Sequence, residues 1–247
     1  MQNCYVCSKK NLWQSTPYWQ DKQRWWKCRN CGSDQLEVPP QGLRIPPKIL
    51  YLDIETALMK VDIFSTFVPG KYISWKAIDK KSFIICWAAA WITDEEKPLK
   101  VYSDAVTSRE AKRGADKRCL EKLFELMDES DYIVGHNARA FDIKKINTRF
   151  LHNKMGAPLE SKVIDTLPLA RKIFKEDSNA LEHWSMILGG TAKDDMRMED
   201  WKRICNNGDE ASLRKMVRYC RGDIRNGVLV FREFDNWVRA SGKRLYR

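Results

Sequence analysis

Acidic residues in three separate segments constrain most strongly what this chain can fold into. The segments are ILYLDIET, IVGHNARAFD and YCRGD, and the side chains of interest in them are Asp53, Glu55, Asp142, Tyr219 and Asp223. Carboxylates brought to one point repel one another and resist the loss of water, so a fold that gathers four of them normally gathers cations as well. Hard divalent cations, which prefer oxygen ligands, are the expected partners. The chain is therefore expected to bring three distant segments to one metal site.

Local spacing supports a shared site. Asp53 and Glu55 are two residues apart on an expected strand, where such residues point to the same face. Tyr219 and Asp223 are four apart on an expected helix and also share a face, while Asp142 opens a helix near the positive end of its dipole. Taken alone, each acid has an ordinary reading as a strand-end, first-turn or solvated residue. Their joint order favours two divalent ions a few ångströms apart, the usual arrangement for cutting phosphodiesters.

A second metal site is indicated by four cysteines near the N-terminus. They form two pairs with two residues between the members, Cys4 with Cys7 and Cys28 with Cys31. Two such pairs about 20 residues apart are typical of a tetrahedral zinc site with four thiolate ligands. A disulfide is disfavoured without a secretory signal, and a catalytic redox pair would not need a matching second pair. We therefore expect one structural Zn²⁺ in a small zinc ribbon over residues 1–38.

The expected ribbon is rich in tryptophan and in basic residues. Trp13, Trp19, Trp25 and Trp26 lie between the cysteine pairs, and residues 1–48 carry eight Lys or Arg against three acids. Some of the indoles must cover the metal site, because so short a module buries little core of its own. Others could stack on bases or dock on the rest of the chain. A nucleic-acid contact and a purely structural ribbon both stay open.

The whole chain is basic, with 44 Lys and Arg against 33 Asp and Glu and a net charge of +11. This surplus suits a polyanionic partner such as nucleic acid, although it also describes a basic protein with a solvated surface. The first residues lack the apolar core of a signal peptide. The longest apolar run, Phe83–Ile92, is shorter than the about 20 residues that cross a bilayer. We expect a protein of the reducing cytoplasm, without membrane contact, whose other cysteines are buried free thiols: Cys86, Cys119, Cys205 and Cys220.

Hydrophobic periodicity predicts an α/β domain over residues 49–247, joined to the ribbon by a proline-containing linker over residues 39–48. Apolar runs predict strands at residues 49–53, 83–93, 99–102, 132–135 and 163–166. Helical spacing predicts helices at residues 116–129, 167–174 and 180–188, another after Asp142, and a long one from residue 209 onward. Strands followed by alternating helices and strands imply a mixed sheet flanked by helices.

The three acidic segments resemble a known set of motifs. LDIET, GHNARAFD and YCRGD are similar to the motifs of the DEDD superfamily of 3′–5′ exonucleases, which have a ribonuclease H-like fold. Their context resembles the proofreading domains of family B DNA polymerases and the stand-alone exonucleases encoded by bacteriophages, and it extends to IICWAAAW and VIDTLPLAR. The resemblance covers about residues 49–237. Because Tyr219 stands four residues before Asp223, it points to the tyrosine branch of the superfamily.

The resemblance implies a role for each site residue. Asp53, Glu55 and Asp223 would hold one Mg²⁺ or Mn²⁺, and Asp53 would bridge to a second ion supported by Asp142. One ion would activate the attacking water, and the other would stabilise the leaving 3′ oxygen. Tyr219 would orient the water, because a phenol with a pKa of about 10 is a poor base at neutral pH. The implied activity is removal of nucleotides from the 3′ end of DNA, at single-stranded or frayed ends.

Three further residues are candidates for substrate contact. His136 and Asn137 follow the fourth expected strand, where they could touch substrate or orient the loop. Asp165 lies in VIDTLPLAR, a segment that extends the resemblance. None of the chain's histidines, which also include His152 and His183, stands where the superfamily would need a general base.

Other interpretations stay open. An exoribonuclease of the same fold would carry the same motifs, because the sequence does not show how a 2′-hydroxyl is treated. A catalytically silent adaptor could bind nucleic acid, or replication or recombination proteins, through the ribbon, although it would not need all five motif residues. A zinc-dependent transcription-type factor is disfavoured, because the ribbon is a small part of the chain. The chain carries no polymerase region, so we expect a free-standing nuclease or a subunit, in the host cytoplasm if a phage encodes it.

Overall fold

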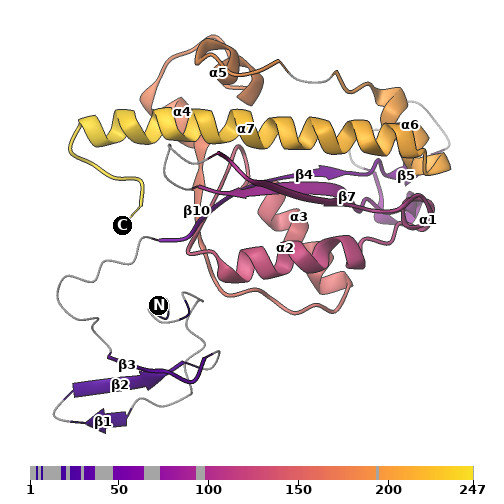
Figure 1. Cartoon of the computed structure of the whole chain (residues 1–247). Coiled ribbons are helices and arrows are strands. Elements are labelled where there is room, and N and C mark those ends of the chain that lie inside the picture. Colours follow the sequence, from indigo (N-terminus) through magenta and orange to yellow (C-terminus); the bar gives the residue numbers. More distant parts are fainter. Residues whose placement is uncertain are drawn as a thin grey trace.

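The computed structural model of the 247-residue chain contains two sheets, of three and five strands, and a short hairpin (Figure 1). It describes Cys4, Cys7 and residues 18–20, 23–28, 31–36, 47–63, 73–92, 98–192 and 195–246. The N-terminal sheet consists of antiparallel β1 (Tyr18–Gln20), β2 (Gln23–Lys27) and β3 (Asp34–Leu36). Trp13 and most of the linker predicted at residues 39–48 lie outside the described residues, so the division into ribbon, linker and main domain stays a prediction.

The main sheet is mixed, as predicted. Its strand order is β10-β9-β4-β7-β8. The strands are β4 (Ile49–Thr56), β7 (Ile84–Trp91), β8 (Val101–Ala105), β9 (Tyr132–Gly135) and β10 (Lys162–Asp165). The pairs β4–β7 and β7–β8 are antiparallel, whereas β4–β9 and β9–β10 are parallel. Strand β4, which has the sequence ILYLDIET, is therefore the central strand and pairs with β9 on one side and β7 on the other.

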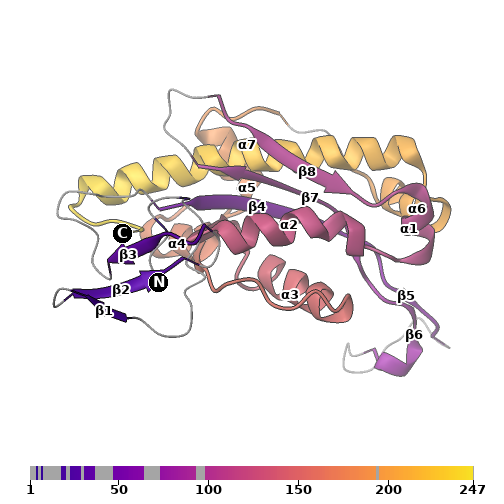
Figure 2. The same cartoon turned by 60° about the horizontal axis from the view of Figure 1, so that its bottom comes forward.

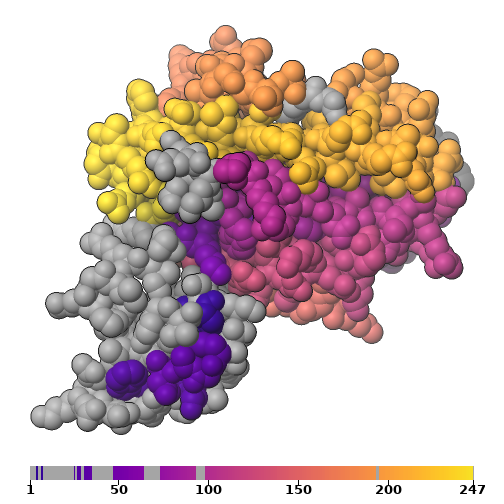
Figure 3. All heavy atoms as spheres, in the orientation of Figure 1, coloured from indigo at the N-terminus to yellow at the C-terminus, as the bar shows by residue number. Residues whose placement is uncertain are grey.

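Helices cover both faces of the main sheet. They are α1 (Ser108–Arg113), α2 (Lys117–Glu129), α3 (Asp142–His152), α4 (Thr166–Ile173), α5 (Leu181–Ile187), α6 (Met198–Asn207) and α7 (Glu210–Ala240). Figure 1 shows α7 running along one face of the sheet with α4 and α5 beyond it, whereas α2 and α3 lie on the opposite face. In the space-filling view, α7 forms a continuous band across the surface (Figure 3). The predicted α/β arrangement is confirmed.

Small residues allow α7 to lie close to the sheet. Residues Ile84 to Ala90 of β7 are all buried and include three consecutive alanines. On β4, Tyr51 is buried against α7 at Gly227, where an added Cβ would lie 2.1 Å from the tyrosine hydroxyl oxygen. Because a side chain at this position would overlap the ring, Gly227 determines how closely the helix and the strand approach.

A buried ion pair ties α3 to the sheet. Asp116, directly before α2, accepts hydrogen bonds from Arg149 of α3 at 2.7 Å and 2.8 Å. The same carboxylate accepts from the backbone N–H of Ile84 in β7 at 2.9 Å. Both charged side chains are buried, and the two-pronged pairing compensates for their loss of water. The pair fixes the position of α3, whose first residue is Asp142.

The observed elements agree with the predicted ones to within a few residues, with the third strand at 101–105 rather than 99–102. The structure adds α1, α6 and a hairpin of β5 (Lys60–Val61) and β6 (Ile78–Lys80). Sequence signals for α1 exist, because Thr107 and Glu110 form a capping box and Gly114 ends the helix in the left-handed conformation. The hairpin strands are too short for a period of two to stand out.

The four cysteines outside the N-terminal pairs are buried and free, as predicted. Among the residues that the structure describes, no helix is both long enough and apolar enough to cross a membrane.

Candidate active site

Three of the predicted acids converge where β4 meets α7. One carboxylate oxygen from each of Asp53, Glu55 and Asp223 lies within 4.8 Å of the others. Asp223 is buried on α7, one turn after Tyr219. Asp53, Glu55 and Tyr219 keep partial exposure, so the group is accessible from solvent. A cluster of carboxylate oxygens that solvent can reach is the donor set that hard divalent cations prefer.

Asp142 approaches the same strand from α3. It is the first residue of that helix, and its buried Oδ1 accepts a hydrogen bond from the backbone N–H of Ile54 at 3.2 Å. Ile54 lies between Asp53 and Glu55, so Asp142 reaches the short segment that carries both acids. It does not belong to the group of oxygens within 4.8 Å. The fourth predicted acid therefore lies beside the three-carboxylate group rather than within it.

Burial and mutual repulsion make this group costly to ionise. Burial raises the pKa of Asp53 well above its usual range, and the charges of Asp142, Asp223 and Glu55 raise it further. Burial also raises the pKa of Asp142 to about 6. The pKa of Tyr219 is raised by burial and then by Asp223, so its hydroxyl keeps its proton at neutral pH. Bound cations would offset the repulsion, and the residues present therefore fit divalent metal ions.

A buried thiol contacts one of the acids of the site. Cys220 on α7, the residue after Tyr219, donates from Sγ to Oδ2 of Asp53 at 3.5 Å. Cys86 lies opposite Glu55 in the register of β4 and β7. The sequence predicts only that both thiols are buried, because their acidic neighbours come from another segment of the chain. Both thiols are therefore buried next to the carboxylates of β4.

A β-bulge lies within the site. The register of β4 against β7 shifts between Glu55 and Thr56, and such a shift redirects the neighbouring side chains. The indole N–H of Trp201 on α6 donates to the carbonyl oxygen of Thr56 at 3.1 Å. The adjacent Asp200 forms an ion pair with Lys215 of α7 at 2.7 Å. Helix α6, which the periodicity analysis does not include, thus links the strand and the helix that carry the acids.

Asp165 organises the loop that leads to Asp142. Its Oδ1 accepts from the backbone N–H of Asn137 at 2.8 Å, and its Oδ2 accepts from that of Arg139 at 3.0 Å. Oδ1 also caps α4 through the N–H of Leu167 at 3.1 Å. Asn137 has a φ of 66°, the left-handed conformation that asparagine tolerates better than most residues. These bonds give Asp165 a structural task at the position where substrate contact was predicted.

His136 is held by two hydrogen bonds. Its Nδ1 lies 2.9 Å from the hydroxyl of Thr166, and its Nε2 donates to the carbonyl oxygen of Asn179 at 2.8 Å. The ring therefore connects the end of β9 to α4 and to the segment before α5. His136 and Asn137 both lie in the loop that leads to Asp142, and these hydrogen bonds join that loop to α4 and to the segment before α5.

The four N-terminal cysteines come together as predicted. Their sulfur atoms all lie within 4.8 Å of one another, with 3.6 Å between Cys4 and Cys31 and 3.8 Å between Cys7 and Cys28. The backbone N–H of Gly32 donates to the carbonyl oxygen of Cys28 at 2.8 Å, and Gly32 has a φ of 70°, so glycine suits this tight turn. None of these four described cysteines forms a disulfide. Four sulfur donors in this arrangement fit a tetrahedral zinc ion.

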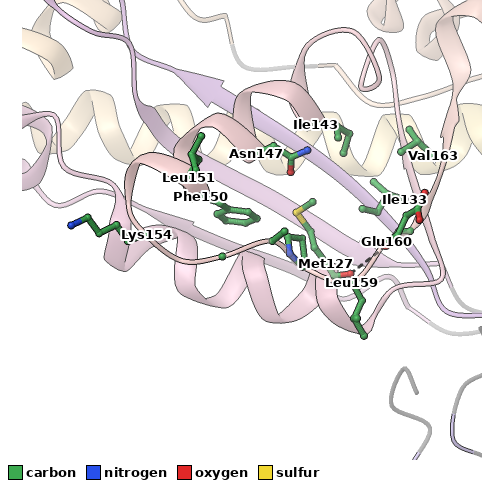
Figure 4. Close-up of a pocket in the computed structure, with 14 residues that line it drawn as sticks. Met127, Ile133, Ile143, Asn147, Phe150, Leu151, Lys154, Leu159, Glu160 and Val163 are labelled. Atoms are coloured by element: carbon green, nitrogen blue, oxygen red, sulfur yellow. Dashed lines mark hydrogen bonds between the residues drawn. The ribbon is translucent and has the colours of Figure 1, made fainter. Parts of the chain in front are cut away.

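A cavity of about 630 Å³ lies elsewhere, on the face of the sheet that α2 and α3 cover (Figure 4). Its apolar lining includes Met127, Ile133, Ile143, Phe150, Leu151 and Val163. None of the five motif residues lines it. The candidate catalytic side chains therefore lie where β4 contacts α7, outside this apolar cavity.

A mixed sheet whose central strand and long C-terminal helix share a carboxylate cluster defines a class of nucleic-acid-processing enzyme. The model of the RNase_H superfamily matches residues 50–234, and the chain belongs to this superfamily. The match includes all three acidic segments and excludes the N-terminal cysteines. No curated protein matches the chain. Membership indicates a nuclease-type hydrolase that uses divalent metal ions.

Proposed function

We propose that this protein is a metal-dependent 3′–5′ exonuclease. The observation that carries the proposal is the convergence of Asp53, Glu55 and Asp223 within 4.8 Å, with Tyr219 one helical turn from Asp223. The order of the three motifs and the presence of tyrosine four residues before the last acid support the tyrosine branch of the DEDD exonucleases. Superfamily membership supports phosphodiester hydrolysis in general.

The acids would hold two Mg²⁺ or Mn²⁺ ions. Asp53, Glu55 and Asp223, whose oxygens lie together, would bind one, and Asp142, which accepts from the N–H of Ile54, would support the other. Bound ions of this kind activate water and neutralise charge on a leaving oxygen. The protein's own contribution is to hold charges together that would otherwise repel, by anchoring α3 through Asp116 and by packing α7 tightly on β4.

Tyr219 orients the attacking water through a hydrogen bond. In the metal-free protein, burial and then the charge of Asp223 raise the pKa of Tyr219, so the phenol is protonated at neutral pH, which favours hydrogen bonding to water over proton abstraction. It remains partly exposed beside the acids, where its hydroxyl can donate to or accept from a water. Positioning of this kind raises turnover without adding a proton acceptor.

We further propose that the substrate is DNA with a single-stranded or frayed 3′ end, and that one Zn²⁺ holds the N-terminal cysteines. The surplus of basic residues favours a nucleic-acid partner over a small phosphate ester. The four buried free cysteines of the main domain suit a reducing compartment such as the cytoplasm. The ribbon is a candidate contact for DNA or for a replication or recombination protein.

The test follows DNA labelled at its 5′ end in the presence of Mg²⁺, Mn²⁺ or a chelator. We expect a ladder that shortens one nucleotide at a time with either metal and no product with the chelator. Immediate release of the labelled mononucleotide would show the opposite polarity, and equal cutting of a circular strand would show an endonuclease. A parallel reaction with labelled RNA separates the proposed function from an exoribonuclease of the same fold.

A further inference from the structure

A hairpin extends directly from the strand that carries Asp53 and Glu55. Beyond Thr56, the chain enters β5, which pairs with β6 in antiparallel fashion. Figure 2 shows this hairpin projecting away from the rest of the domain, at the end of the molecule near α1 and α6. The hairpin is therefore connected to the candidate active site by a short stretch of chain and reaches outward from it.

The base of the hairpin is anchored to the domain. The ammonium group of Lys80 donates to the carbonyl oxygens of Ala111 and Lys112 in α1, both at 3.0 Å, and of Cys205 in α6 at 3.1 Å. These carbonyls lie toward the C-terminal ends of the two helices, where a positive charge is favourable. Within the hairpin, Asp62 N–H donates to the carbonyl oxygen of Ala77 at 2.8 Å. The described part of the hairpin is thus bonded to α6, the helix whose Trp201 also donates to Thr56 at the β-bulge.

The hairpin carries an unusual share of the exposed apolar side chains. Four of them lie within residues 59–75, namely Met59 (57%), Ile63 (49%), Ile73 (39%) and Trp75 (71%). Trp75 begins a 3₁₀ turn, in which the backbone N–H of Lys76 donates to the Ser74 hydroxyl oxygen at 3.4 Å. Exposed apolar side chains that are grouped within one short segment, unlike single ones, mark an interaction site.

The lysine beside the indole indicates what that partner is. Among the described hairpin residues, Lys60 forms an ion pair with Asp79 at 3.3 Å and Lys80 is held by the helix carbonyls, whereas the Lys76 ammonium lies 6.0 Å from the centre of the Trp75 ring. Exposed aromatic rings with lysines beside them are how proteins bind single-stranded nucleic acid, because bases stack on the rings while lysines contact phosphates. A duplex offers no free base face for such stacking.

We propose that Trp75 stacks on an unpaired base of the substrate strand, upstream of the nucleotide that is removed, with Lys76 beside it to contact phosphate. The inference rests on the proposed function and adds a second contact on the same strand. Asp62, which donates to Ala77, stands seven positions after Glu55. At about 3.4 Å per residue, Asp62 lies within about 24 Å of Glu55, and Trp75, two residues before Ala77, lies within about 30 Å. A strand of at most about nine stacked nucleotides, at about 3.4 Å each, covers this span.

Because of this distance, the proposal predicts a dependence on strand length. Single-stranded DNA of about 20 nucleotides is longer than this limit and would reach both the acids and Trp75, whereas a dinucleotide strand, the shortest substrate with a phosphodiester, would occupy the acids alone. We expect Trp75→Ala to raise KM for the longer strand about tenfold and to leave its kcat unchanged. The KM for the short strand should equal that of the wild type. Trp75→Phe should recover most of the lost affinity, because it restores a ring for stacking.

A matched control is available on α7. Trp237 is 62% exposed, and Trp237→Ala should leave both KM values unchanged. An equal rise of KM for the long and short strands would mean that Trp75 supports the site structurally and would overturn the proposal. Unchanged KM values for both strands would overturn it too, and would leave the hairpin to a protein partner.

Binding of the longer strand in chelator separates this inference from the proposed function. Fluorescence anisotropy of labelled DNA should report the same roughly tenfold loss for Trp75→Ala when no cleavage can occur. If the wild type binds through Trp75 but never cleaves in Mg²⁺ or Mn²⁺, the nuclease proposal fails and the stacking contact stands. If it cleaves normally and binding does not depend on Trp75, only the stacking contact fails.

Discussion

At the scale of single residues, the site stores unfavourable electrostatic energy that ligands relieve. Asp53 is surrounded by three further carboxylates and has a raised pKa for that reason and because of burial. We expect Asp53→Ala to lower exonuclease turnover by more than about 100-fold, because even the loss of groups behind a metal ligand costs about 10–100-fold. Thermal unfolding in chelator should show no loss of stability, since one repelling charge is removed. Near wild-type cleavage by the folded variant would contradict the metal assignment.

Tyr219 allows a sharper separation of roles. Tyr219→Phe removes the hydroxyl but keeps the ring on α7, so we expect turnover to fall by about 10–100-fold. The metal concentration for half-maximal activity should not change, because no ligand is lost. Steady-state rates over a range of Mg²⁺ concentrations provide both quantities. A variant with wild-type turnover would make Tyr219 a packing residue of that helix.

The raised pKa of Asp142 predicts an unusual dependence of stability on pH in the metal-free protein. Burial raises this pKa from 3.8 to about 6, so between these values the folded state binds more protons than the unfolded state. The penalty for the charged form is present at pH 7 and is lost as the pH falls toward 4. Asp142→Asn keeps the acceptor for Ile54 and removes the charge, so it should be more stable than the wild type at pH 7, by up to about 3 kcal/mol. Urea unfolding in chelator should show this difference shrinking as the pH falls, and a growing difference would contradict the assignment.

The motif residues were predictable because each pair is local. Asp53 with Glu55, and Tyr219 with Asp223, share a face through the periods of a strand and a helix alone. Cys220 and Trp201 were not recognised as parts of the site, because their contacts join segments more than 100 residues apart. Spacing along the chain carries no information on such pairs.

At the scale of elements, α6 is the part of the site that the sequence analysis leaves out. Its signal is present, because Met198, Trp201, Ile204 and Cys205 recur at helical spacing and Gly208 ends the helix in the left-handed conformation. What the pattern could not provide is the hydrogen bond from Trp201 to the bulge after Glu55. The strands β4, β7 and β9 were easier, because they are short apolar runs of the kind expected for buried strands.

The bond from α6 gives a testable expectation. Trp201→Phe keeps an aromatic ring in place and removes only the N–H that Thr56 accepts. We expect the bulge to hold Glu55 less firmly, so that half-maximal activity requires about tenfold more Mg²⁺. Turnover at saturating Mg²⁺ should stay close to that of the wild type. Lys202→Ala, on the exposed side of the same helix, is the control, and an equal effect in both variants would point to α6 stability instead.

At the scale of the whole molecule, the chain combines two candidate metal centres of different chemistry. The N-terminal cysteines offer soft sulfur ligands, and the main domain offers hard oxygen ligands. We expect elemental analysis to find one zinc ion per chain, retained when Mg²⁺ is removed. Cys28→Ser should lose the zinc and unfold the N-terminal module without abolishing metal-dependent cleavage. Zinc absent from the folded wild-type protein, or complete inactivity of a folded Cys28→Ser variant, would contradict this independence.

The contact between Gly227 and Tyr51 limits how the length of α7 can vary in related chains. Since the ring of Tyr51 fits only against glycine, α7 has one position along β4, set four residues after Asp223. One residue inserted between Asp223 and Gly227 would turn the acid by about 100° away from Asp53 and Glu55. Residues added or lost after Gly227 would change the far end of the helix and leave the acids aligned. In related chains, insertions and deletions in α7 should therefore occur after Gly227. They should be absent between Asp223 and Gly227.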